Sequence, residues 1–326
     1  MVTAIEPVLR QQLIDRRQKL QFAASNFQDS GELSRLLSEV DAALNRMEKG
    51  TYGLCDYCHD PVETDRLIAD PLTCLCIDHL TPIEQRALEA DLELAARIQN
   101  GLLPQPSLNV DGWQVAYHYE PAGLVSGDYC DLITGEDGTL HFVLGDVSGK
   151  GVAASMLMAH LQAMFRTLVS IKLPLGQMLE RASRVFCEST LPTHYATLVC
   201  GRLNPNGSLE ISNAGHLPPL LVQGAEVRAI EATGLPLGMF SNEEFTVEKF
   251  QLNRGDTLFL YTDGLSEVSD GAGSEYGINR LTSVLKKNCG FAPKEMIESC
   301  LRELTAFGPD VAPADDLSVM AIKRVH

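Results

Sequence analysis

Four aspartates that stand beside glycines or at the ends of apolar runs could hold hard metal ions. They are Asp128, Asp146, Asp263 and Asp315. Two of them end runs that are typical of buried strands, LHFVLGDV and TLFLYTDG, and a glycine lies beside each carboxylate. A single aspartate in such a place usually forms a turn. Several together favour a site for Mg²⁺ or Mn²⁺, whose preferred ligands are carboxylates and water.

Two short chelating pairs predict a second metal site of different chemistry. Cys55 and Cys58 are separated by two residues, and after 17 further residues Cys76 and His79 repeat this spacing. Thiolate and imidazole ligands in two such pairs are typical of tetrahedral zinc. Because four protein ligands leave no position for a reacting water, this zinc is expected to be structural.

The other cysteines show no such spacing. Cys74 and the nearby His59 are spare and could substitute for a member of the chelating pairs. The remaining five are scattered along the chain and are expected to be small buried hydrophobic residues. They are Cys130, Cys187, Cys200, Cys289 and Cys300.

The run GDVSGKG at residues 145–151 superficially resembles a phosphate-binding P-loop. A P-loop needs four residues between its first glycine and the Gly-Lys pair, followed by serine or threonine. Here three residues intervene and Gly151 follows the lysine. The spacing therefore excludes a nucleotide-binding loop of this kind.

The N-terminal part of the chain predicts two helices. Residues 5–22 and 32–48 have helical apolar periodicity, and a turn-rich stretch at 26–31 separates them. Two such helices around a short turn predict an αα-hairpin, which the chelating pairs follow.

A third helix is expected between the two parts of the chain. Thr81 and Pro82 are typical of an N-cap and a first helical residue, and the helix should end before Pro104. Its apolar seam could be a dimer interface or could pack on its own domain. The seam consists of Leu88, Leu92, Ala95, Ile98 and Leu102. The predicted domains are 1–82, a linker helix at 83–103, and 104–326.

From Trp113 onward, short β-rich runs alternate with helical stretches. The runs are WQVAYHY, LHFVLGDV, YATLVCGRL, SLEISNAG, PLLVQ, DTLFLYTDG and LSVMAIKR. Helices are expected at roughly 151–170, 175–190, 279–287 and 293–306. Strands in clusters with helices in separate blocks predict a layered α+β domain.

The composition limits the choice of partners. The 26 basic and 43 acidic residues give a formal charge of −17. A protein that coats a nucleic-acid backbone or an anionic membrane needs the opposite sign, so neither is the expected partner. The sequence has no run of 18 apolar residues, and its first residues lack a signal-peptide core. We therefore expect a cytoplasmic protein.

Seven motifs in order resemble the metal-dependent serine/threonine phosphatases of the protein phosphatase 2C superfamily, and more closely the bacterial RsbU/SpoIIE subgroup. The motifs are AARIQNGLLP at 95–104, SGDYCD at 126–131, GDVSGKG at 145–151, NAGH at 213–216, TGLPLG at 233–238, LYTDGL at 260–265 and DDLSV at 315–319. The resemblance spans residues 90–324 and implies an αββα sandwich of two antiparallel sheets with helices outside.

The resemblance also implies two Mn²⁺ or Mg²⁺ ions and assigns their ligands. Asp146 would bridge both ions, the carbonyl of Val147 would bind one, and Asp263 and Asp315 would hold the other. Asp128 would bind directly or through water. Asp131 and Asp316 would be neighbours of the site.

The reaction implied is hydrolysis of a phosphomonoester by a water that the two ions activate. In the eukaryotic branch a histidine follows the bridging aspartate by two residues, but here the position is Ser148. The general acid is therefore unassigned, and a metal-bound water is the preferred candidate. Lys150 could pair with phosphate or be a solvated loop residue. His216 is expected to shape a loop rather than bind metal.

Residues 46–79 resemble the zinc finger of the DksA/TraR family. The runs GTYG at 50–53 and LCID at 75–78 carry this resemblance. Members of that family typically act on RNA polymerase through a long helical hairpin, but the hairpin is short here and His79 stands where a cysteine is usual. We interpret this part as a regulatory or docking module.

Two functions follow from these resemblances. The first is a phosphoprotein phosphatase whose substrate is a phosphorylated STAS-domain anti-sigma-factor antagonist in a partner-switching pathway, controlled by the zinc module through the helix at 83–103. The alternative is a zinc-finger transcription regulator with a non-catalytic phosphatase fold as its scaffold. The complete set of aspartates favours the enzyme.

Overall fold

The structure is a computed structural model that describes residues 2–26, 31–80, 82–270, 273–308 and 315–326. Contacts within the chain divide it into two units, Met1–Ala90 and Asp91–His326. This division falls inside helix α4 (Pro82–Leu102), which corresponds to the expected linker helix. The predicted N-cap at Thr81 and most of the predicted turn at 26–31 lie outside the described residues.

The first unit contains the expected helical hairpin. Helices α1 (Val2–Asn26) and α2 (Gly31–Glu48) pack against each other, and α1 is longer than the periodicity predicted. Leu13 of α1 and Val40 of α2 are buried in their shared core, which extends to the chelating pairs through Cys55 and Cys76. The segment that follows α2 contains the short helix α3 (Thr64–Ala69) and a 3₁₀ turn at Ile77–His79.

The second unit contains two antiparallel sheets. The first has the order β1-β2-β11-β10-β7-β8. Its strands are β1 (Ser107–Val110), β2 (Trp113–Glu120), β7 (Leu220–Gln223), β8 (Glu226–Ala229), β10 (Thr257–Tyr261) and β11 (Leu317–Arg324). The second has the order β3-β4-β5-β6-β9. Its strands are β3 (Asp128–Thr134), β4 (Leu140–Val147), β5 (Ala196–Leu203), β6 (Ser208–Ala214) and β9 (Glu248–Gln251).

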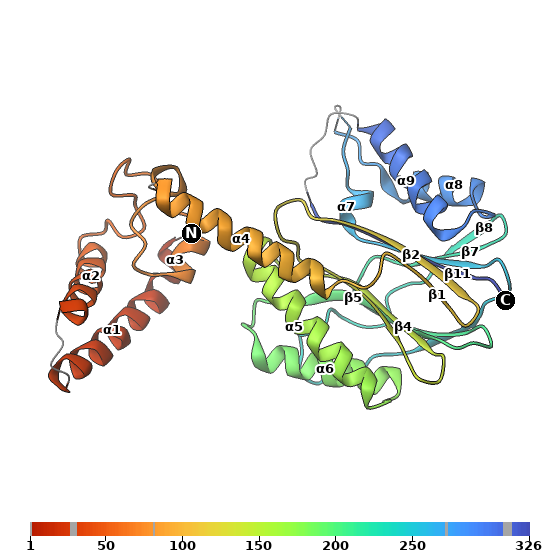
Figure 1. Ribbon diagram of the computed structural model, residues 1–326, viewed down its shortest axis with the longest axis horizontal. Helices are drawn as coiled ribbons and strands as arrows, with labels where there is room; N and C mark the ends of the chain where they lie inside the picture. The colour runs from red at the N-terminus through yellow and green to blue at the C-terminus, as the bar shows by residue number, and fades with distance from the viewer. Residues whose placement is uncertain (1, 27–30, 81, 271–272, 309–314) are drawn as a thin grey trace. The chain divides into compact units, whose positions relative to one another are not determined.

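Helices cover the outer face of each sheet (Figure 1). Helices α5 (Gly151–Ser170) and α6 (Leu175–Ser189) pack on the β3–β9 sheet, whereas α8 (Gly277–Lys287) and α9 (Pro293–Phe307) pack on the β1–β8 sheet. Between the sheets lies a core of side chains that are at most 1% exposed, including Trp113, Phe142, Leu144, Leu260 and Met320. The expected αββα sandwich is therefore confirmed.

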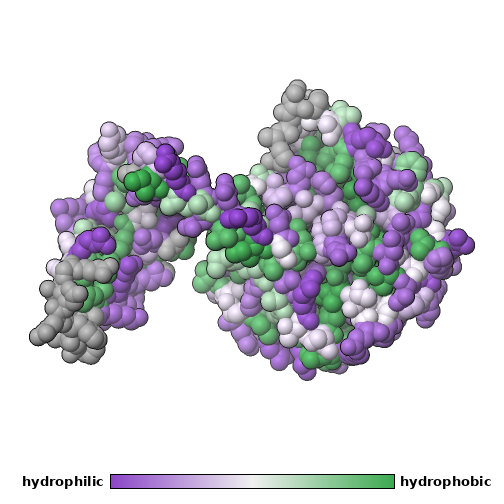
Figure 2. Space-filling view, in the orientation of Figure 1, coloured by the Kyte–Doolittle hydropathy of each residue, from purple (hydrophilic) through white to green (hydrophobic). Residues whose placement is uncertain are grey.

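Among the described residues, α5 alone has the length and hydropathy of a helix that could cross a membrane, a criterion that core helices of globular domains also meet. Its apolar side chains Met158, Leu161 and Phe165 are buried against the sheet beneath it. Figure 2 shows hydrophilic and hydrophobic residues interspersed over the second unit, so some apolar side chains stay in contact with water.

The expected β-rich runs all form strands, and the four expected helices all form. Four strands lie outside the predicted runs: β1, β3, β8 and β9. Three of them are only four residues long and alternate between exposed and half-buried positions, so their apolar signal is weak. The fourth, β3, carries two buried aspartates and a threonine, which mask its strand pattern.

Candidate metal-dependent active site

Two of the predicted ligands meet because β3 and β4 pair in antiparallel register. Asp128, the first residue of β3, lies directly opposite Asp146, near the end of β4. Gly127 allows this close approach, since a Cβ there would lie 3.3 Å from Oδ1 of Asp146 and 3.2 Å from the carbonyl oxygen of Val147. The carboxylate of Asp146 and the carbonyl of Val147 therefore lie against the same turn.

The other two predicted ligands come from the opposite sheet. Asp263 is the first residue of the short helix α7 (Asp263–Ser266), which begins just after β10 ends. Asp315 lies just before β11, the strand that pairs with β10. The two turns are tied by Thr262, whose N–H donates to the carbonyl of Ser318 at 2.9 Å.

The side chain of Thr262 joins the two sheets at the site. Its buried hydroxyl donates to Oδ2 of Asp128 at 3.0 Å and accepts the N–H of Ser318 at 2.9 Å. A residue between β10 and α7 thus fixes the carboxylate at the start of β3. Sequence analysis did not identify this residue, although its place immediately before Asp263 is a usable signal.

The two predicted neighbours of the site have different roles. Asp316 accepts the N–H groups of Ala122 and Gly127, both at 2.8 Å, so its two oxygens hold the loop that leads to Asp128. Asp131 lies within β3 but is fully buried, and it forms a two-point ion pair with Arg166 of α5 at 2.9 and 3.0 Å. Asp131 therefore joins β3 to α5.

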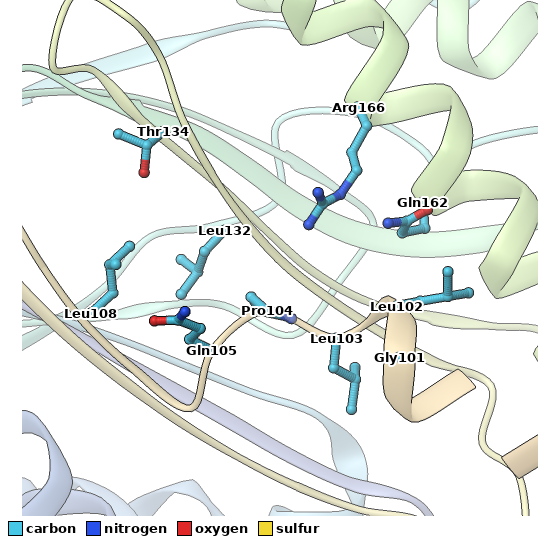
Figure 3. A pocket seen from close by; sticks show the side chains of 10 residues that line it. All are labelled: Gly101, Leu102, Leu103, Pro104, Gln105, Leu108, Leu132, Thr134, Gln162 and Arg166. Carbon is cyan, nitrogen blue, oxygen red and sulfur yellow. The ribbon is translucent and has the colours of Figure 1, made fainter. Parts of the chain in front are cut away.

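Arg166 also borders a pocket of about 340 Å³ near the end of α4. Figure 3 shows Arg166 and Gln162 projecting from α5, with Leu102 and Pro104 nearby at the end of α4. The lining is mixed: Arg166, Gln162, Gln105 and Thr134 supply polar groups beside leucine and proline side chains. This pocket contains none of the predicted metal ligands.

A buried glutamine was also missed by sequence analysis. The side chain of Gln99, in α4, donates to the carbonyl of Ser126 at 2.7 Å and accepts its N–H at 2.9 Å. The hydroxyl of Ser126 in turn accepts the N–H of Asp128 at 3.0 Å. The helical pattern gave no signal for Gln99, because its partner is 27 residues away in the sequence.

Burial, and then the charges of neighbouring aspartates, raise the pKa of three of the predicted ligands. Burial, followed by the charges of Asp263 and Asp315, raises the pKa of Asp146 to about 7. Burial and the charge of Asp315 raise the pKa of Asp263. The pKa of Asp128 is raised well above its ordinary value, mainly because this carboxyl is buried. Such mutual repulsion is what a divalent cation would relieve.

Two of these carboxylates, Asp146 and Asp263, line a pocket of about 360 Å³. Its lining includes Asp146, Ser148, Tyr195, His216 and Asp263. The Ser148 hydroxyl accepts the N–H of Tyr195 at 3.0 Å, so it serves the loop as well as facing the pocket. Lys150 lies nearby and its Nζ pairs with Oδ2 of Asp315 at 2.9 Å, although its side chain is 67% exposed.

His216 shapes the wall of this pocket. Its Nδ1 lies 2.9 Å from the hydroxyl of Thr197, and its Nε2 lies 3.2 Å from the carbonyl of Tyr261. The second contact requires a proton on Nε2, so Nδ1 accepts the hydroxyl proton of Thr197. Burial lowers the pKa of His216 to about 4. The neutral imidazole therefore links β5 to the end of β10.

The chelating pairs converge on one point in the first unit. The ligand atoms of Cys55, Cys58, Cys76 and His79 all lie within 4.8 Å of one another. Sγ of Cys58 and Sγ of Cys76 are 3.7 Å apart. Tetrahedral zinc with Zn–S bonds of about 2.3 Å places its sulfurs about 3.8 Å apart, so the set fits zinc.

Spare groups near the chelating pairs are placed differently. The carbonyl of Cys74 accepts the N–H of Asp56 at 2.8 Å, and His59 is exposed in the left-handed backbone region with φ of 61°. The ring of Tyr57 stacks on His79 at 4.7 Å. In the part of the chain that the structure describes, the Cys/His set is the one group of three or more ligands that converges this closely.

The donor atoms of the aspartate site are carboxylate and carbonyl oxygens, which fit Mg²⁺ or Mn²⁺ rather than a soft metal. These oxygens do not converge on a single point as the Cys/His ligands do. They come instead from both sheets, and two of the carboxylates, those of Asp146 and Asp263, line one pocket.

Comparison with protein families gives one clear match. The sequence model of the family described as Stage II sporulation protein E (SpoIIE) matches residues 136–325. This segment covers more than half of the chain and includes the turns that carry Asp146, Asp263 and Asp315.

Bacterial proteins are similar to this chain in sequence. Protein IcfG of Synechocystis sp. is 28% identical over 72% of this chain and 41% of its own length. Phosphoserine phosphatase RsbU of Bacillus subtilis is 22% identical over 74% of this chain and 72% of its own length. The chain thus spans less than half the length of the first of these relatives.

Solved structures show the same fold. The RsbU and RsbW domains of Rv1364c from Mycobacterium tuberculosis give a TM-score of 0.60 at 30% identity, over 68% of this chain and 63% of that one. The SiaA-PP2C domain of Pseudomonas aeruginosa gives a TM-score of 0.66 at 18% identity, over 74% of this chain and 99% of that one.

Proposed function

The chain belongs to the stage II sporulation protein E family of phosphatase domains, and on this premise we propose that it hydrolyses phosphoserine or phosphothreonine in a phosphoprotein. The observation that carries the proposal is that turns of both sheets bring Asp146 and Asp263 to one pocket, where burial and then the charges of neighbouring aspartates raise the pKa of both carboxyls. A scaffold without catalysis would gain nothing from this repulsion, which costs stability.

The proposed ligands are those of the family pattern. Asp146 and the Val147 carbonyl would hold one Mn²⁺ or Mg²⁺, and Asp263 and Asp315 would hold the other, with Asp128 beside them. When bound, the ions would neutralise the phosphate and supply an activated water.

The chain's own residues prepare the site for this reaction. Thr262 and the loop held by Asp316 fix the carboxylate of Asp128, so it needs little reorganisation on binding. Lys150 pairs with Asp315 and thereby restrains its carboxylate. His216 keeps the wall in place as a neutral group, and its low pKa makes it a poor general acid.

The test is manganese-dependent release of phosphate from a serine-phosphorylated STAS-domain protein. Asp146→Asn and Asp263→Asn should each lower turnover by a factor of about 10³ or more, because each removes a ligand charge. Asp91→Asn, in an exposed part of α4, is the matched control and should keep wild-type activity. Equal activity in wild type and all three variants would reject the assignment of this chain as a phosphatase.

We further propose that the substrate is a STAS-domain anti-sigma-factor antagonist in a partner-switching pathway. The support is the likeness to the phosphoserine phosphatases RsbU and RsbP, the latter 27% identical over 54% of this chain. A cytoplasmic location is part of the same proposal. The substrate proposal can be tested by comparing the rates at which the enzyme hydrolyses phosphorylated STAS proteins and free phosphoserine. Faster hydrolysis of free phosphoserine would count against the proposal.

For the first unit we propose one structural zinc on Cys55, Cys58, Cys76 and His79, and a regulatory role. The 3.7 Å sulfur separation supports the zinc. The regulatory role rests on α4, which begins in this unit and ends within the phosphatase unit, and which we propose as the interface of a homodimer. Deletion of residues 1–80 should change turnover or oligomeric state. A truncated enzyme with unchanged turnover and unchanged oligomeric state would refute the regulatory role of the first unit.

A further inference from the structure

A group of exposed apolar side chains lies beside the active-site pocket. It comprises seven residues, here called the apolar rim, that are between 37% and 68% exposed. They are Val152, Met156, Leu191, Tyr195, Leu235, Met239 and Phe240. They belong to three segments: the first turns of α5, the loop between α6 and β5, and the loop that follows β8.

Hydrogen bonds tie the first two segments to each other. The N–H of Ser148, just before α5, donates to the carbonyl of Tyr195 at 2.9 Å, and the N–H of Tyr195 donates to the Ser148 hydroxyl at 3.0 Å. Both residues also line the active-site pocket. The apolar rim is therefore continuous with the place where the phosphate must enter.

Further hydrogen bonds tie the third segment to the other two. Ala196 and Leu237 exchange backbone hydrogen bonds of 2.9 and 2.8 Å, which places the loop after β8 against the end of the loop before β5. The hydroxyl of Ser183, in α6, accepts the N–H of Gly238 and contacts the carbonyl of Phe240. Helices α5 and α6 lie side by side (Figure 1). The three segments that carry the rim are thus held against one another.

Apolar side chains that gather in this way usually mark a surface that another molecule covers. The pocket is lined by both polar and apolar side chains, and Tyr195 belongs to the pocket and to the apolar rim, so a protein substrate in the pocket can extend onto the rim. Acidic groups flank this surface: Glu267 lines the pocket, and Glu243 accepts the N–H of Leu235. These charges disfavour a strongly acidic peptide.

We propose that the apolar rim docks a folded phosphoprotein through apolar side chains that this substrate presents beside its phosphorylated residue. The proposal rests on the proposed phosphatase function and names the feature that selects the substrate. The enzyme recognises a surface of a folded domain, whereas a short phosphopeptide fills only the pocket.

Three substrates distinguish an effect on docking from an effect on the chemical step. They are p-nitrophenyl phosphate, a serine-phosphorylated STAS-domain protein, and a synthetic phosphopeptide with the sequence around the phosphorylated serine of that protein. Leu191→Ser combined with Phe240→Ser should raise KM for the folded protein at least tenfold. It should leave kcat/KM for p-nitrophenyl phosphate and for the peptide within twofold of wild type. Met156→Ser alone should act in the same direction, and it guards against misfolding of the double variant.

The matched control is Ile171→Ser, which changes an apolar residue of similar exposure at the other end of α5. It should leave all three substrates unchanged. Equal KM for the folded protein in wild type and rim variants would overturn the docking proposal, as would a parallel loss on all substrates. If a rim variant instead changes the oligomeric state of the enzyme in sedimentation, the rim is an interface with a second copy of this chain, and the docking proposal is wrong. Failure of wild type on every substrate would reject the phosphatase function itself.

Discussion

At the scale of single residues, buried polar side chains decide how the site is held. Thr262, Asp316 and Gln99 each use their hydrogen-bonding atoms to fix backbone or carboxylate groups around Asp128. Each of these contacts joins segments that are distant in the sequence. A buried group of this kind costs about 1–3 kcal/mol when its partner is removed.

His216 predicts a specific dependence of stability on pH. Its folded-state pKa is about 4, below the ordinary value of 6.5, so the unfolded chain binds more protons between these values. The stability that His216 contributes is present above pH 6.5 and is lost as pH falls toward 4. The full difference is roughly 3 kcal/mol, at about 1.4 kcal/mol per pKa unit.

Urea unfolding of wild type and His216→Gln at pH 5 and pH 7.5 would measure this contribution. The wild-type protein should lose more stability on acidification than the variant does. The comparison is needed because the raised pKa values of Asp146 and Asp263 act in the opposite direction, stabilising the folded state in acid. His326→Gln, at an exposed position, is the control. Identical pH profiles for wild type and His216→Gln would contradict the assignment.

At the scale of elements, the site depends on turns that bring strands close together. The turn after β10 passes so near β11 that a Cβ on Gly264 would collide with the carbonyl oxygen of Asp316. This contact lies between the residue after Asp263 and the residue after Asp315, so the two turns approach closely here. The glycine beside a predicted ligand therefore has a steric role, as the sequence suggested.

Gly264→Ala should separate the two turns and weaken metal binding. We expect the affinity for Mn²⁺ in calorimetry to fall at least tenfold, because the ligands on the two turns would no longer share one geometry. Gly290→Ala, where a Cβ would meet nothing within 4 Å, is the matched control. Unchanged affinity in Gly264→Ala would show that the turn can shift without cost.

Local patterns predicted much of this architecture, because apolar strands ending in Asp-Gly and paired chelating residues are short-range signals. The chelating set of Cys55, Cys58, Cys76 and His79 converges as the spacing predicts. Asp131 shows where such reasoning fails. It lies in the same motif as Asp128, yet its partner Arg166 is 35 residues away on α5. Only the packing of that helix on β3 decides its role.

At the scale of the whole molecule, the two units have separate cores and different sets of candidate metal ligands. The core of the first unit is small and reaches directly to Cys55 and Cys76. A metal that joins Cys55 and Cys76 within this small core would add its binding free energy to the stability of the unit. The second unit has three large apolar clusters that contain none of the chelating residues.

Removal of zinc should therefore unfold the first unit and leave the second folded. Calorimetry of wild type with a zinc chelator, or of Cys58→Ser, should show loss or a large downward shift of one transition, while the other stays in place. Cys74→Ser is the matched control, because Cys74 lies outside the converging set. A common downward shift of a single transition would show that the units unfold together.

The position of β11 has a consequence for biosynthesis. This strand, Leu317–Arg324, is inserted between β2 and β10, and its residues pair with strands that the ribosome made about 200 and 60 residues earlier. Until it emerges, the sheet has a gap at its centre and Asp315 has no fixed place. A nascent polypeptide stalled before this point should be inactive and accessible to chaperones and proteases. Activity should therefore begin only after translation has passed this strand.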